Sequence, residues 1–151
     1  MKLTVISVGK KHNKLLAGAI ADFEKRLRAP FNFEWRFLTS SIFEGEKARI
    51  EESERLEKLL SNDDFVILLD ERGRNFSSPE LAEILTHNLS QKNVKIVIGG
   101  AFGVSDNFRS RANLVWSLSK LVFPHQIVRL VLAEQIYRAQ EISRGGKYHH
   151  E

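Results

Sequence analysis

Apolar and polar positions follow two different periods along this chain. FVILLD at 65–70 and VKIVIG at 94–99 are almost continuously apolar, which indicates central parallel strands covered on both faces. LTVISVG at 3–9 is a short β-branched run, and FNFEWRFL at 31–38 alternates apolar and polar residues as a half-exposed edge strand does. ANLVWSLS at 112–119 predicts a further strand.

Helices are expected between these strands. Residues 15–28 carry apolar residues on one face, at the spacing of an amphipathic helix. Ser41 and Glu44 predict a capping box for a highly charged helix that runs through Leu60 and faces solvent.

Three more helices are expected in the second half of the chain. Ser78 and Pro79 predict the N-cap and first residue of a helix that ends near Leu89. Ser105 is expected to cap a short helix. The last helix is predicted to open at Pro124, to run through Ile142 and to end before Gly145 and Gly146.

Five strands interleaved with five helices predict a single α/β domain with a mostly parallel sheet. A length of 151 residues fits one domain. No segment reaches the apolar length of a membrane span, and the start of the chain lacks the apolar core and cleavage site of a signal peptide. The chain has no cysteine, which excludes disulfides and zinc–thiolate sites. We therefore expect a cytoplasmic protein without membrane contact.

The net charge of +4 gives mild support for an anionic partner. The position of the charges is more informative than their sum. The first 75 residues are nearly neutral, and the basic excess lies toward the C-terminal end, which closes with SRGGKYHHE.

Three strand ends are candidate ligand sites, because open α/β sheets bind ligands outside the carboxyl ends of their strands. They are Leu69–Asp70 followed by ERGR, the glycine turn at 99–103, and the loop SLSKLVFPH at 117–125. Each also has a plain structural interpretation, respectively a solvated strand end, a tight turn and a helix start. The loop combines small hydroxyls with apolar residues, which suits a flat aromatic ligand better than a bare phosphate.

Familiar nucleotide, metal and hydrolase signatures are missing. The G-G-x-x-G spacing matches neither the dinucleotide fingerprint nor the phosphate loop, and the first strand is followed by a single glycine. The histidines are scattered or adjacent in the tail, so no metal site is expected. No Ser-His-Asp arrangement follows from the spacing.

The second half of the chain carries GGAFG, SLSKLVFPH, VR-(x)4-EQIYRA and the terminal YHH, and the first half carries VISVGKKHN and FEKRL. At these separations the motifs resemble those of the RlmH family of SPOUT methyltransferases, and the resemblance covers essentially the whole chain. It implies a methyltransferase that uses S-adenosylmethionine to methylate N3 of a pseudouridine in a stem-loop of large-subunit ribosomal RNA. The expected substrate is the assembled ribosome.

The resemblance also implies a fold and a cofactor site. Residues of about 65–151 would form a deep trefoil knot, and two chains would form a homodimer through their knots. By match of position, the cofactor would be held by Leu69, Gly100, Ser119, Lys120, Leu121, Val122, Phe123 and Pro124. This chain departs from its relatives in two places: Leu121–Val122 stands where Met-Thr is frequent, and Lys147 stands where proline is frequent.

Candidates for proton transfer and RNA contact lie after the cofactor loop. His125, His149 and His150 could each act as a general base, and the sequence does not choose among them. The candidate RNA-binding residues are Arg129, Arg138, Arg144, Lys147 and Tyr148. Alternatively, Arg129 and Arg138 pair with acids of the last helix, such as Glu134.

Two rival functions fit parts of this pattern. A non-catalytic ribosome-associated RNA-binding protein would keep the basic tail without a cofactor loop. A nucleotide-binding regulatory domain would keep the glycine turn without a basic tail. The presence of both features favours the enzyme.

Overall fold

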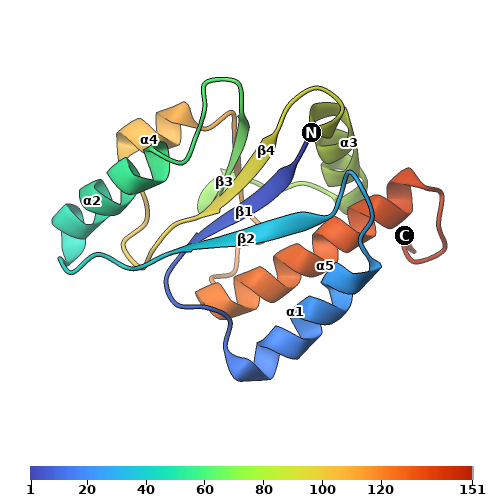
Figure 1. Ribbon diagram of the computed structural model, residues 1–151, viewed down its shortest axis with the longest axis horizontal. Coiled ribbons are helices and arrows are strands. Elements are labelled where there is room, and N and C mark those ends of the chain that lie inside the picture. Colours follow the sequence, from blue (N-terminus) through green and yellow to red (C-terminus); the bar gives the residue numbers. More distant parts are fainter. Residues whose placement is uncertain (151) are drawn as a thin grey trace.

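A five-stranded sheet runs through the centre of the molecule (Figure 1). The computed structural model describes residues 1–150. All four neighbouring pairs of strands are parallel, and their order is β2-β1-β4-β3-β5. The strands are β1 (Leu3–Val8), β2 (Phe33–Leu38), β3 (Phe65–Arg74), β4 (Val94–Ile98) and β5 (Leu114–Trp116).

Helices cover both faces of this sheet, so the molecule has three layers (Figure 1). Helices α1, α3 and α5 pack together on one face, and α2 and α4 cover the other. Their bounds are α1 (Lys14–Arg26), α2 (Gly45–Glu57), α3 (Ser78–Leu89), α4 (Asp106–Arg111) and α5 (His125–Ser143). The predicted single α/β domain with a parallel sheet is confirmed.

The hydrophobic core is divided by the sheet into two clusters. Along β4, Ile96 and Ile98 face the layer of α3 and α5, whereas Val97 faces the layer of α2 and α4. Successive residues of a strand point to opposite faces, so a strand covered on both sides needs apolar residues at nearly every position. The predictions of central strands at 65–70 and 94–99, and of an edge strand at 31–38, are confirmed.

Two helix starts differ from the sequence prediction. Helix α2 begins after Glu44 without a side-chain cap, and the Ser41 hydroxyl instead accepts a hydrogen bond from the backbone of Phe43. The predicted capping box at Ser41 and Glu44 is therefore wrong. A capping box exists one helix later, where Ser77 and Glu80 each accept a backbone hydrogen bond from the other. The N-cap is therefore Ser77 and not Ser78, which the sequence predicted. Ser77 is preferred because Glu80, which completes the capping box, is three residues after it.

The two strands nearest the predicted ligand loop also differ from expectation. β3 continues through Arg74, whereas β5 is limited to Leu114–Trp116. Trp116 pairs with both Leu69 and Arg74, so the intervening residues bulge out of the ladder. The segment ERGR is therefore part of an irregular strand end and is not a free loop.

No helix of residues 1–150 is both long enough and apolar enough to cross a membrane. The trefoil knot that the family resemblance implies stays a prediction.

Candidate active site

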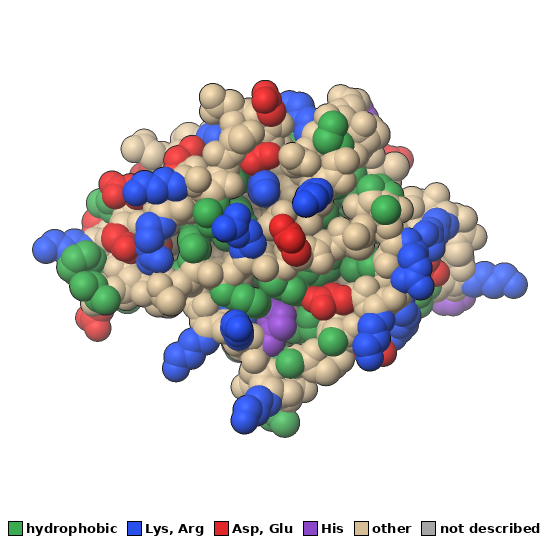
Figure 2. All heavy atoms as spheres, viewed as in Figure 1, with side chains coloured by type: hydrophobic (Ala, Val, Ile, Leu, Met, Phe, Trp, Pro, Cys, Tyr) green, Lys and Arg blue, Asp and Glu red, His purple; other side chains and the backbone are tan. Residues whose placement is uncertain are grey.

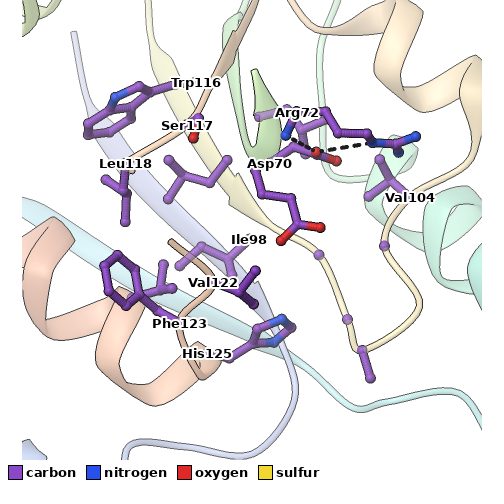
Figure 3. A pocket seen from close by; sticks show the side chains of 18 of the residues that line it. Asp70, Arg72, Ile98, Val104, Trp116, Ser117, Leu118, Val122, Phe123 and His125 are labelled. Carbon is purple, nitrogen blue, oxygen red and sulfur yellow. Dashed lines mark hydrogen bonds and ion pairs between the residues drawn. The ribbon is translucent and has the colours of Figure 1, made fainter. Parts of the chain in front are cut away.

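A pocket of about 440 Å³ lies at the carboxyl ends of β3, β4 and β5. Its walls come from the end of β3, the glycine turn after β4, and the connection between β5 and α5. Figure 3 shows Trp116, Leu118 and Phe123 along one side, with Asp70 and Arg72 opposite and His125 at one end. The three strand ends singled out in the sequence thus form one site.

Most of the residues that the resemblance assigned to the cofactor meet here. Lys120 and Pro124 are outside the lining: Lys120 is exposed, and Pro124 is the N-cap of α5. The residues that do line the pocket are Leu69, Gly100, Ser119, Leu121, Val122 and Phe123.

Sequence reasoning missed part of the apolar wall. Trp116 and Leu118 line the pocket from β5 and the residues after it, and Val128 joins them from the first turn of α5. Trp116 is 3% exposed, so its ring also belongs to the core. A signal was present, since apolar residues stand directly before the SLSK loop and three positions after His125.

The loop after β5 is held in shape by its own hydroxyl groups. Ser117 Oγ donates to the Ser119 carbonyl at 2.7 Å, and Ser119 Oγ accepts from the Leu121 backbone at 3.0 Å. Asn75 Nδ2 donates to the Ser117 carbonyl at 3.0 Å. The two serines therefore shape the loop, and its backbone and apolar side chains face the pocket.

The glycine turn is supported from behind by α2. Gly103 has a φ of +75°, a left-handed conformation that glycine adopts without strain, and its N–H donates to the Gly100 carbonyl at 3.0 Å. A Cβ on Gly100 would collide with the carboxylate of Glu52 and lie 3.2 Å from Val8 Cγ1. Ser53 Oγ accepts from the Ser105 backbone at 2.8 Å and ties the far end of the turn to the same helix. Gly100 is thus needed for close packing against α2.

An ion pair stands at the rim of the pocket. Asp70 accepts a hydrogen bond from Arg109 at 2.6 Å and another from the Arg72 backbone at 2.8 Å. Burial raises the pKa of Asp70, but these hydrogen bonds and charges outweigh it and hold the pKa below its usual value. Asp70 is therefore an anion that joins β3 to α4, and it is not a proton donor at neutral pH.

His125 is the first residue of α5, and its ring lines the pocket (Figure 3). Burial lowers the pKa of this imidazole, the positive charge of Arg129 lowers it further, and Glu52 opposes both effects. The ring is consequently neutral at pH 7 and has a free electron pair that can accept a proton.

Arg129 differs from both sequence interpretations. Its side chain is 1% exposed, donates from Nε to Ser7 Oγ at 3.1 Å, and lies over the Phe37 ring with its Cζ 5.0 Å from the ring centre. Burial lowers its pKa, and its Nη1 has no hydrogen-bond partner within residues 1–150. A side chain buried in this position is shielded from RNA phosphates, and its charge acts instead on the neighbouring His125.

The tail folds back onto the later turns of α5. Arg138 pairs with Glu134 at 2.6 Å, as the alternative interpretation expected, and its Nη1 lies 3.2 Å from Nδ1 of His149. The Tyr148 hydroxyl donates to the same Glu134 carboxylate at 3.1 Å, and its ring packs edge-on against Tyr137. Arg144, Lys147 and His150 are exposed, and Glu151 lies outside the described residues.

The tail and the pocket are separate within one chain. Glu134 is nine residues after His125, which places it about 13 Å further along the helix axis. Neither His149 nor His150 lines the pocket. Of the three candidate bases, only His125 stands at the pocket of its own chain.

The part of the chain that the structure describes contains no cluster of metal ligands. Within residues 1–150, no group of three or more histidine, aspartate or glutamate side chains could hold a metal ion.

Comparison with known proteins gives a consistent result. A family model described as "Predicted SPOUT methyltransferase" matches residues 1–149. Proteins named "Ribosomal RNA large subunit methyltransferase H" are similar over 99% of this chain, at 37% identity in Desulfitobacterium hafniense and 40% in Geobacter metallireducens, with 99% of each relative covered. The one from Geobacter sulfurreducens is 41% identical over 99% of this chain and all of its own. The chain therefore belongs to the SPOUT methyltransferase family, and the resemblance seen in its sequence is confirmed.

Proposed function

We propose that this enzyme transfers a methyl group from S-adenosylmethionine to N3 of a pseudouridine in large-subunit ribosomal RNA, on the assembled ribosome in the cytoplasm. The observation that carries the proposal is the convergence of three strand ends on one pocket with His125 at its edge. The names of the relatives supply the RNA class. The target nucleotide comes from the family resemblance.

The pocket fits the proposed cofactor in size and lining. About 440 Å³ is within the range of about 300–1,000 Å³ that small-molecule sites occupy. Apolar walls at Trp116, Leu118 and Phe123 suit a flat ring, and the backbone of the glycine turn offers close polar contacts. Lys120 and Pro124 lie outside the lining, so they would shape the loop and not touch the ligand.

The bound cofactor supplies an electrophilic methyl group on a sulfonium. The chain contributes position and a proton acceptor. Holding two reactants in attack geometry can supply about 7–11 kcal/mol of the barrier, and a general base adds about 10²–10⁴-fold. His125 is neutral at pH 7 because of its burial and Arg129, so its imidazole accepts the N3 proton of the target base.

A second copy of the chain would complete the site. The pocket loop and the first turn of α5 expose Leu121, Val122 and Ile127 at 68%, 76% and 37%, an apolar surface that association would cover. The tail packs on a different part of α5 from the pocket. A homodimer lets Arg144, Lys147, Tyr148 and the tail histidines of one subunit serve the pocket of its partner.

The proposal is tested in two steps. Calorimetry with S-adenosylmethionine and with S-adenosylhomocysteine should show binding of both, and no heat from either would refute the methyltransferase site. A transfer assay on whole ribosomes, separate subunits and bare ribosomal RNA, followed by mass spectrometry of the nucleosides, should find methylpseudouridine in the large-subunit RNA, with whole ribosomes as the best substrate. A methyl group on another base or position would overturn the assigned target.

A further inference from the structure

The connection between β1 and α1 carries a cluster of positive charge. Lys10, Lys11 and Lys14 are all exposed, and none of them takes part in an ion pair within residues 1–150. Figure 2 shows basic side chains projecting from this part of the molecule, where β1 runs into α1 in Figure 1. Three unpaired cations within five residues form a surface that attracts anions.

This connection is anchored from the inside. The ring of His12 packs edge-on against Trp35, with ring centres 4.6 Å apart, and against Phe37 at 5.2 Å. Asn13 caps α1 by accepting from the Leu15 backbone at 2.9 Å. His12 therefore faces inward, and the lysines before and after it face solvent.

A single side chain ties the connection to the candidate active site. Gln126 accepts from the Asn13 backbone at 2.8 Å through Oε1 and donates from Nε2 to the Lys11 carbonyl at 3.4 Å. Gln126 directly follows His125, whose ring lines the pocket. The position of the three lysines is thus set by the same helix start that carries the proposed base.

We infer that Lys10, Lys11 and Lys14 bind phosphates of the substrate RNA and place the target base over the pocket. The inference rests on the proposed function and adds an RNA contact on the N-terminal half of the chain. RNA is favoured over an acidic protein because its phosphates are regularly spaced along the backbone, so that neighbouring lysines on an anchored segment can each neutralise one. Such contacts fix the register of a nucleic acid without reading its sequence.

The test replaces all three lysines by glutamine and compares a matched control. The control replaces Lys2, Lys58 and Lys92 by glutamine, which removes the same charge. These three lysines are exposed near the amino-terminal ends of the strands, whereas Lys10, Lys11 and Lys14 follow the carboxyl end of β1. Binding to bare large-subunit ribosomal RNA is measured at several salt concentrations. The loop variant should bind about tenfold more weakly, and the slope of log Kd against log salt should fall by about two to three, one for each phosphate that a lysine no longer neutralises. The control should stay within about twofold of wild type.

Two further measurements are made. One separates the position of the three lysines from their charge, and the other separates RNA binding from binding of the cofactor. Gln126→Leu keeps all three lysines but releases the connection, so it should raise KM for ribosomes while the salt slope stays that of wild type. The lysine variant should bind S-adenosylmethionine as wild type does.

Each other outcome refutes the inference. An unchanged Kd and slope, or an equal loss of affinity in the control, shows that the lysines do not bind RNA. A raised KM for ribosomes with unchanged affinity for bare RNA shows that the loop meets a ribosomal protein instead. RNA binding is measured without methyl transfer, so a wild-type chain that transfers no methyl group refutes the proposed function and leaves the result on the lysines intact.

Discussion

The Nε of Arg129 donates a hydrogen bond to the Oγ of Ser7 at 3.1 Å, inside the protein between α5 and β1. Arg129 is one helical turn after His125, and its charge lowers the pKa of that imidazole. Burial is the larger cause of the lowered pKa of His125, and the buried cation adds to it, so the proposed base is neutral.

Arg129→Met should move the acid limb of the pH–rate profile to higher pH. Transfer requires neutral His125 and is lost as the pH falls through the His125 pKa. That pKa lies below 6.5 in the wild type, and it rises when the cation is removed and Glu52 remains. Arg129→Lys keeps the charge and is the control. Methionine has a similar volume, but Glu52 remains a buried carboxylate, so thermal unfolding of both variants is measured beside the pH profile. An acid limb at the wild-type pH would show that the charge of Arg129 does not set the His125 pKa.

His125→Asn should lower kcat for methyl transfer by about 10²–10⁴-fold, the usual contribution of a general base. Affinity for S-adenosylmethionine, measured by calorimetry, should change only a few-fold because the apolar walls remain. The matched variants His149→Asn and His150→Asn show whether the tail supplies a base instead. If His125→Asn turns over at the wild-type rate and a tail variant does not, the base is in the tail.

Gly100→Ala should destabilise the protein by about 1–3 kcal/mol, because its new methyl group meets the Glu52 carboxylate. Glu52→Ala alone should also destabilise, since Ser41 N–H loses its acceptor. The double variant should lose less stability than the two single variants lose together, and the difference, the coupling energy, should be about 0.5–3 kcal/mol. Urea unfolding of all four proteins measures this cycle. Additive losses would show that the alanine is accommodated without moving Glu52.

Deletion of residues 144–151 should reduce methyl transfer severely, because the tail is proposed to contact the RNA at the partner's pocket. Cofactor affinity should stay nearly unchanged, because the cations and the aromatic ring of the tail suit RNA and none of them lines the pocket of its own chain. A small decrease in stability, about 1–2 kcal/mol, is expected because Tyr148 packs on Tyr137 and donates to Glu134 in the intact chain. Single-turnover rates and thermal unfolding measure the two effects. Wild-type transfer by the truncated chain would remove the tail from the mechanism.

Ile127→Glu should convert the proposed dimer to a monomer at micromolar concentration, because a carboxylate would be buried in an apolar interface. Ile42 is 92% exposed and precedes α2, which covers the opposite face of the sheet from α5, so Ile42→Glu is the matched control. Light scattering distinguishes the two masses. A wild-type chain that is monomeric across the same range would contradict the dimer outright.

Local periodicity was enough to predict the elements and the fold class. Nearly continuous apolar runs at 65–70 and 94–99 indicate strands covered on both faces, and alternation at 31–38 indicates an edge strand, so a parallel α/β sheet followed from the order of residues. The three strand ends were found for the same reason, because carboxyl ends of parallel strands meet at one edge.

Contacts between distant segments could not be predicted from the sequence, and only the folded chain shows them. A basic residue in the sequence carries no mark of burial, so Arg129 was expected at the surface and lies in the core, where Ser7 accepts its hydrogen bond. Glu52 reaches the glycine turn from a helix 48 residues earlier, and Gln126 holds the Lys11 segment across 115 residues. Such contacts depend on the strand order β2-β1-β4-β3-β5, which brings distant segments together and leaves no periodic trace in the sequence.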